Sequence, residues 1–157
     1  MFRPLIYVQI SPERVSIRNL KTGASITQVP EIAIRGARDD PKARIVAIGA
    51  LARVAATADS RVSVFNPFAY PRWGMADFPL AGQLLKGLLH PLQEGFLRIA
   101  PRMVVHPLGV PEDGLTPREQ QAFRQLAVEA GASSAVLWQG RELSDEELRQ
   151  GRFELDA

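Results

Sequence analysis

The sequence contains no cysteine, so disulfide bonds and thiolate metal sites are excluded, as is common in a reducing compartment. Its two histidines, His90 and His106, are too few and too isolated to indicate a metal centre. No run of residues approaches the roughly 20 apolar residues that a membrane-spanning helix needs. The N-terminus also lacks the apolar core of a signal peptide. We therefore expect a cytoplasmic protein.

Net charge is small, at +2, and arginine greatly outnumbers lysine. Nucleic-acid-binding proteins usually cluster basic residues on one face, often with aromatic residues between them. Here the basic residues are scattered along the chain, at Arg14, Arg18, Arg35, Arg38, Arg53 and Arg61 among others. We interpret them as solvated surface residues and expect no nucleic-acid partner.

The segment from Pro101 to Trp138 predicts a βαβ unit. Met103–His106 and Ser134–Trp138 have the composition of buried strands, and an amphipathic pattern between them predicts a helix over Thr116–Ala130. Thr116 and Glu119 have the spacing of a capping box at the start of that helix. Such a unit requires a parallel sheet with the helix on one face.

An antiparallel meander is predicted ahead of this unit. Its strands are expected at Leu5–Ile10 and Val15–Leu20, followed by a third strand over Ala24–Ile34 that Pro30 interrupts. Because proline has no N–H group to donate, Pro30 is expected at a bulge or at the edge of the sheet.

The remaining segments are assigned from local patterns. They comprise a strand at Arg44–Ile48, a small helix at Gly49–Ala56, a strand at Val62–Phe65, a packed loop at Asn66–Gly74, a leucine-rich helix capped by Asp77 and ending near His90, and a last helix that starts at the capping box Ser144–Glu147. The tail Gly151–Ala157 has no predicted partner. Core packing of the leucine-rich helix is favoured over contact with a membrane. Asp39-Asp40 and Glu146-Glu147 are expected to face solvent.

The predicted fold class is mixed α/β, with an antiparallel three-strand meander followed by parallel strands and flanking helices. The length of 157 residues is that of a single domain, expected over residues 1–157.

Five segments, in the correct order, resemble the first half of MreB, a bacterial member of the actin-like ATPase superfamily. They are Val29–Ile34, Ile45–Gly49, Asn66–Phe78, Pro101–Val105 and Glu119–Leu137. The resemblance implies an actin-like, ribonuclease H-like first domain. It also implies that the chain ends where the second domain of the family begins, so that only one side of the nucleotide cleft is present.

The family binds ATP, but this sequence departs from it at the first phosphate loop. That loop reads Asp-x-Gly-Thr in the family, and the matching positions here are Gln9, Ser11 and Pro12. Gln9 has no charge for Mg²⁺, and Pro12 lacks an N–H group for phosphate. The resemblance therefore implies a degenerate loop that holds no metal and no nucleotide cofactor.

Glu119 matches the family's position for the residue that orients the attacking water. The alternative is that it serves only in the capping box with Thr116, and the degenerate phosphate loop favours this second interpretation. We therefore predict no catalytic residue.

Three hypotheses for function remain open. The first is a non-catalytic, truncated MreB-like module that binds a protein partner or itself and is associated with the cytoskeleton and cell shape. The second is an actin-like protein with residual ATP binding and weak ATPase activity, using Glu119 and a rearranged loop at Ser11. The third is a remnant that only folds.

Overall fold

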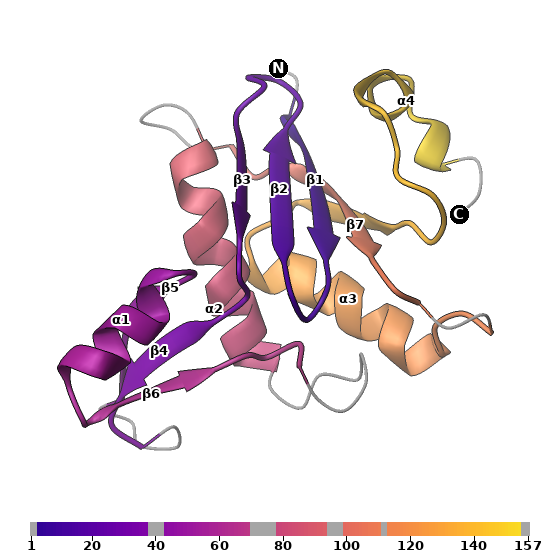
Figure 1. The fold of residues 1–157 in the computed structure, drawn as a ribbon. Helices are drawn as coiled ribbons and strands as arrows, with labels where there is room; N and C mark the ends of the chain where they lie inside the picture. The colour runs from indigo at the N-terminus through magenta and orange to yellow at the C-terminus, as the bar shows by residue number, and fades with distance from the viewer. Residues whose placement is uncertain (1–2, 38–42, 70–77, 94–98, 111–112, 155–157) are drawn as a thin grey trace.

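The computed structural model describes residues 3–37, 43–69, 78–93, 99–110 and 113–154 (Figure 1). Five strands form a sheet in the order β3-β2-β1-β7-β8. Their bounds are β1 Leu5–Ile10, β2 Val15–Asn19, β3 Ser25–Gln28, β7 Arg102–Pro107 and β8 Ser134–Leu137. β1 pairs antiparallel with β2 and parallel with β7, while β2–β3 is antiparallel and β7–β8 is parallel. The predicted mixed α/β class is confirmed.

A second, three-stranded sheet was not predicted. It has the order β5-β4-β6 and consists of β4 (Ile32–Arg35), β5 (Arg44–Ile48) and β6 (Val62–Phe65), all antiparallel. Helix α1 (Leu51–Ala58) packs against this sheet through the buried Ala52 and the partly buried Ala55 and Ala56.

The predicted third strand over Ala24–Ile34 is therefore wrong. The chain leaves the large sheet after Gln28 and enters the small sheet at Ile32. Pro30 lies in the connection, where it cannot donate to a ladder, and the Glu31 N–H group donates to the Val29 carbonyl at 2.9 Å. Pro30 thus separates two strands instead of occupying a bulge or an edge within one.

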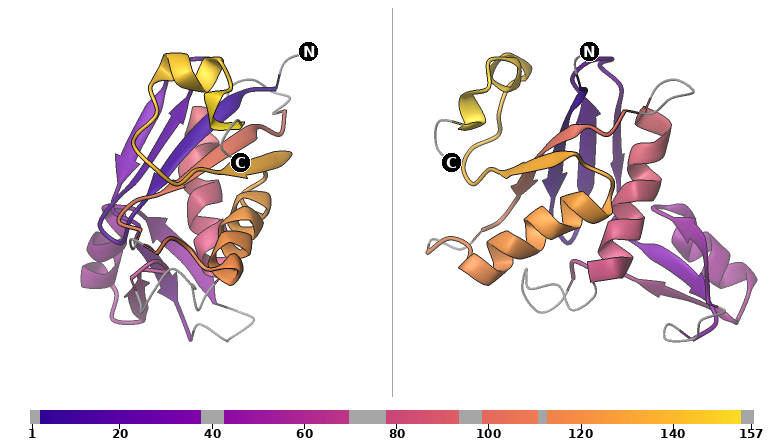
Figure 2. Two further views of the ribbon diagram at one scale, coloured as in Figure 1. Left: turned by 90° about the vertical axis from the view of Figure 1, so that its right-hand side faces the viewer. Right: turned by 180° about the vertical axis from the view of Figure 1, so that it is seen from behind.

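Two helices bury one face of the large sheet, as Figures 1 and 2 show. They are α2 (Phe78–Leu89), which continues into the 3₁₀ turn η1 (His90–Leu92), and α3 (Pro117–Glu129). The leucines of α2 and η1 share a core with Ile6, Val8, Met103 and Val105. Core packing of this helix and its end at His90 are confirmed. None of the described helices is both long and apolar enough to cross a bilayer.

The C-terminal segment packs against the opposite face of the same sheet. It contains α4 (Asp145–Arg149), which starts at the predicted capping box, and the 3₁₀ turn η2 (Arg152–Glu154). Because side chains alternate along a strand, Tyr7 and Val104 face away from the α2–α3 side. They form a second core with Leu143, Leu148 and Phe153, among others. Phe153 is 1% exposed, so the tail has a partner that the sequence did not reveal.

Candidate functional site

The turn between β1 and β2 uses its own hydrogen-bond donors. The Ser11 N–H group donates to the Arg14 carbonyl at 2.9 Å, and the Arg14 N–H group donates to the Ser11 carbonyl at 3.3 Å and to Ser11 Oγ at 3.0 Å. Pro12 has no N–H group, and its carbonyl accepts from Asn66 Nδ2 at 2.8 Å. These bonds leave only the Glu13 amide of the turn for another partner.

Gln9 is half-buried near the end of β1, level with Ser16 on β2 and with His106 on β7. It lines a polar cavity of about 270 Å³ in which Glu142 is the single lining carboxylate. Mg²⁺ prefers carboxylate and water oxygens in octahedral geometry. In the described ranges, no group of three or more His, Cys, Asp or Glu side chains could hold a metal ion. Gln9, Ser11 and Pro12 supply no carboxylate for Mg²⁺, and the degenerate phosphate loop stays a prediction.

Glu119 occupies the first turn of α3 and is 4% exposed. Its carboxylate accepts from the Thr116 N–H group at 2.8 Å, while its own N–H group donates to Thr116 Oγ1 at 3.1 Å. The predicted capping box is confirmed, and the absence of a catalytic role stays a prediction.

The topology brings the predicted site residues to the end of the large sheet where strands β1 and β7 finish. β1 and β7 are parallel and end side by side at Ile10 and Pro107. The turn after β1 and the start of α3, which follows β7, therefore lie at the same end, with Glu119 near the N-terminus of that helix. In the β1–β2 turn, the Ser11 and Arg14 N–H groups are already bonded within the turn.

A buried hydrogen-bond network that the sequence did not reveal lies beside Gln9. His106 is 2% exposed and contacts the Tyr7 hydroxyl through Nδ1 at 2.6 Å and the Gly140 carbonyl through Nε2 at 2.8 Å. The Leu143 N–H group donates to the Tyr7 hydroxyl at 3.2 Å. Because the Gly140 carbonyl can only accept, Nε2 must carry the proton, and the Tyr7 hydroxyl donates to Nδ1. Every group is then paired, provided that the imidazole is neutral.

Burial stabilises the neutral forms of both side chains. It lowers the pKa of His106 below its ordinary value and raises the pKa of Tyr7. The pair therefore attaches residues 140–143 to the sheet. His106 was expected to be a polar residue at a strand end, and it is the last residue but one of β7. Its partners come from the neighbouring strand β1 and from a loop distant in sequence, so no sequence pattern could have identified them.

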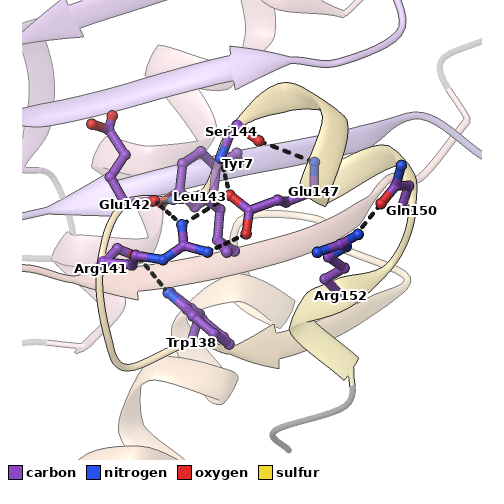
Figure 3. A network of polar contacts seen from close by, with 9 residues as sticks. All are labelled: Tyr7, Trp138, Arg141, Glu142, Leu143, Ser144, Glu147, Gln150 and Arg152. Carbon is purple, nitrogen blue, oxygen red and sulfur yellow. Dashed lines mark hydrogen bonds and ion pairs between the residues drawn. The ribbon is translucent and has the colours of Figure 1, made fainter.

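Figure 3 shows how this C-terminal segment is held together. Glu147 accepts hydrogen bonds from the Arg141 guanidinium and from the Ser144 N–H group, and Trp138 Nε1 donates to the Arg141 carbonyl at 2.8 Å. The Arg141 hydrogen bonds lower the pKa of Glu147 to about 2. Glu146 is exposed as expected, whereas the expectation that Glu147 faces solvent is wrong, because its side chain is only 17% exposed.

Of the other carboxylates and histidine that the sequence singled out, the structure describes only some. Asp39 and Asp40 lie outside the described residues, as do Asp77 and residues 70–74 of the predicted packed loop. His90 is exposed at the start of η1, away from His106 in sequence and in the fold.

Comparison with known proteins identifies the fold. No protein-family model and no curated protein matches the sequence. Among solved structures, MreB 5 of Spiroplasma citri bound to AMPPNP aligns with a TM-score of 0.64 at 19% identity, and the same protein bound to ADP aligns with a TM-score of 0.61 at 18%. A non-polymerising mutant of MamK bound to AMPPNP aligns with a TM-score of 0.65 at 13% identity.

Each alignment covers 87% of this chain but only 38% to 41% of the other protein. The chain therefore has the fold of part of these actin-like proteins, and the fold that the resemblance to MreB implied is confirmed.

Proposed function

We propose that this actin-like chain is a non-catalytic protein-interaction module, equivalent to the first domain of an MreB-like protein over residues 1–157. The observation that carries the proposal is the closed turn at residues 11–14, where two N–H groups are bonded within the turn and Pro12 has none. The proposed role is an association with the cytoskeleton, with cell shape as its physiological setting.

The energetic argument concerns the nucleotide. A hydrogen bond to a charged group contributes about 1.5–3 kcal/mol, so withholding two or three amides from the phosphates removes several kcal/mol of binding free energy. Gln9 adds no charge for Mg²⁺, which would otherwise offset phosphate repulsion. A tight Mg-nucleotide site of the kind implied for MreB is therefore not expected at this turn.

An interaction role is supported by exposed apolar side chains on the small sheet and its helix. Ile45 and Val46 on β5 and Leu51 and Val54 on α1 are between 38% and 66% exposed. Exposed apolar groups that gather on one part of a surface often mark a protein contact. One solved neighbour is described as a non-polymerising mutant, so self-association is a second kind of contact to test.

The proposal is tested by following the thermal midpoint of unfolding while Mg-ATP is added to millimolar concentration. A ligand that binds only the native state must raise stability, by about 2.7 kcal/mol at a hundred times its Kd. We expect no shift relative to Mg²⁺ alone. A saturable rise in the midpoint would support the residual-ATPase hypothesis instead.

The interaction role is tested separately by sedimentation at micromolar concentration, alone and with candidate cytoskeletal proteins. We expect a concentration-dependent complex with a defined stoichiometry. A monomer that sediments independently of every candidate contradicts the interaction role.

A further inference from the structure

Strand β5 presents an unpaired edge. It lies at the end of the β5-β4-β6 order, so every second N–H and C=O group points away from β4. The ladder shifts register between Ala33 and Ile34, which leaves Val46 without a partner on β4. Ile45 is 44% exposed and Val46 is 38% exposed. Residues 45–48 contain neither proline nor a charged residue, which are two of the devices that usually protect an edge.

A groove runs beside this edge. Its volume is about 470 Å³, and it is lined by four consecutive residues of β5, Ile45–Ile48, and by Gln83, Lys86, Gly87 and His90 of α2 and η1. The helix approaches the strand closely at one point, because a Cβ atom on Gly87 would lie 2.5 Å from Ile48 Cδ1. The groove therefore has the strand edge as one wall and the polar side of α2 as the other.

The positive charge of the groove indicates which kind of protein segment it could bind. Lys86 and His90 line it, Arg44 precedes its apolar wall, and no carboxylate is among the lining residues. A second copy of the chain pairing through its own β5 would bring another Arg44 and no acidic residue within the strand Arg44–Ile48. Charge complementarity therefore favours a different, acidic partner over a second copy.

We propose that this groove binds an extended segment of a partner protein in which acidic residues alternate with apolar residues. The segment adds a strand to the free edge of β5 by main-chain hydrogen bonds. Its apolar side chains pack on Ile45 and Val46, and its carboxylates face Lys86. This inference rests on the proposed interaction role and specifies its surface and the chemistry of its partner.

The test is a fluorescence anisotropy titration with a short synthetic peptide in which glutamates alternate with valine and isoleucine. We expect saturable binding, at least tenfold tighter than for the same peptide with lysine in place of glutamate. Val46→Asp and Lys86→Glu are each expected to weaken binding about tenfold, since each places a carboxylate beside the glutamates of the peptide.

Matched controls are available on the same chain. Val128→Asp changes an exposed valine of α3 outside the groove, and Lys21→Glu reverses an exposed lysine in the β2–β3 turn. Both are expected to bind the peptide unchanged. N-methylation of alternate peptide amides should abolish binding for the set that faces β5 and leave the other set unaffected, which is the signature of strand addition.

Absence of saturable binding, or equal binding by the Val46→Asp variant, overturns this inference. Its failure is distinguishable from failure of the proposed function. If the peptide does not bind and Mg-ATP does not raise the thermal midpoint, the groove assignment is wrong and the non-catalytic assignment stands. A thermal response to Mg-ATP contradicts the non-catalytic assignment whatever the peptide does.

Discussion

The Tyr7 hydroxyl and the His106 imidazole can be buried because they form a hydrogen bond with each other. The Tyr7 hydroxyl both donates to His106 Nδ1 and accepts from the Leu143 N–H group, so no donor or acceptor in the chain of bonds is left unpaired. A buried polar group without a partner destabilises a protein more than a formed hydrogen bond stabilises it. The network therefore specifies the position of residues 140–143 as well as contributing to stability.

Replacing Tyr7 by phenylalanine tests this residue-scale argument. Tyr7→Phe keeps the ring but leaves His106 Nδ1 and the Leu143 N–H group unpaired, so we expect the free energy of unfolding to fall by about 1–3 kcal/mol. Urea denaturation measures the change. The control is Ser16→Ala, which removes the hydroxyl of the exposed Ser16–Thr27 pair and should alter stability by less than about 0.5 kcal/mol. Equal effects of the two substitutions contradict the network.

Stability should depend on pH through His106. Its pKa is lowered by burial in the folded state from an ordinary value of 6.5. The unfolded state therefore binds more protons as the pH falls below about 6.5, and the free energy of unfolding decreases until the pH reaches the folded pKa. Glu147 titrates near pH 2, below this window. Urea denaturation between pH 7 and pH 5 should show the decrease, and His106→Gln should remove it. An unchanged slope in the variant contradicts the assignment.

At the residue scale, the sequence predicted those side-chain hydrogen bonds that join residues close together in the chain. Thr116 and Glu119 form a local capping box, and so do Ser144 and Glu147, and both boxes are present in the fold. The role of His106 depends on a loop 34 residues away, for which the sequence contains no periodic pattern. The groove beside β5 was missed for the same reason.

The close contact between α2 and α3 depends on a glycine. A Cβ atom on Gly82 would lie 2.7 Å from Glu129 Cβ, which cannot move without the backbone of α3. Gly82→Ala should therefore destabilise the protein by about 1–3 kcal/mol through overpacking, despite a helix-propensity gain of up to about 1 kcal/mol.

The matched control for Gly82 is Gly87→Ala on the same helix. There the close atom is the terminal Cδ1 of Ile48, which can rotate away, so the destabilisation should be smaller. Thermal or urea unfolding of both variants gives the comparison. If Gly82→Ala is the more stable of the two, the α2–α3 packing described above is wrong.

At the element scale, strands with a strong local pattern were predicted with their observed bounds, as at Val62–Phe65 and Arg44–Ile48. The error occurred where one apolar run crosses between two sheets. Which sheet a strand joins depends on the distant strand with which it pairs. Ile32–Arg35 pairs with β5 and β6 instead of β2. The periodicity of residues 24–34 is the same in either case.

Helices cover one face of the large sheet, and the C-terminal segment covers the other face over Tyr7 and Val104. Ile6 and Val8 face the helices, while Tyr7 faces the second core with Leu148 and Phe153. The central strand β1 is therefore buried on both sides. The sequence predicted the order of elements and the parallel unit. It did not predict that the C-terminal segment packs against the second face of the sheet.

Phe153→Ala tests whether the tail is part of the folded unit. Removing a fully buried phenylalanine side chain should destabilise the protein by about 3–5 kcal/mol. The exposed Arg149→Ala in the same segment should have an effect below about 0.5 kcal/mol. Urea denaturation should show one cooperative transition shifted for Phe153→Ala. An unshifted transition would show that the tail folds independently of the sheet.

The central claim is that an actin-like fold here lacks a working phosphate site, and the most direct measurement observes that site. Amide NMR spectra recorded during a Mg-ATP titration report on Ser11, Glu13 and Arg14 individually. Because Ser11 and Arg14 donate within the turn, we predict no saturable chemical-shift change at these amides up to millimolar nucleotide. A saturable shift that converges on these three residues and on Glu119 would contradict the account.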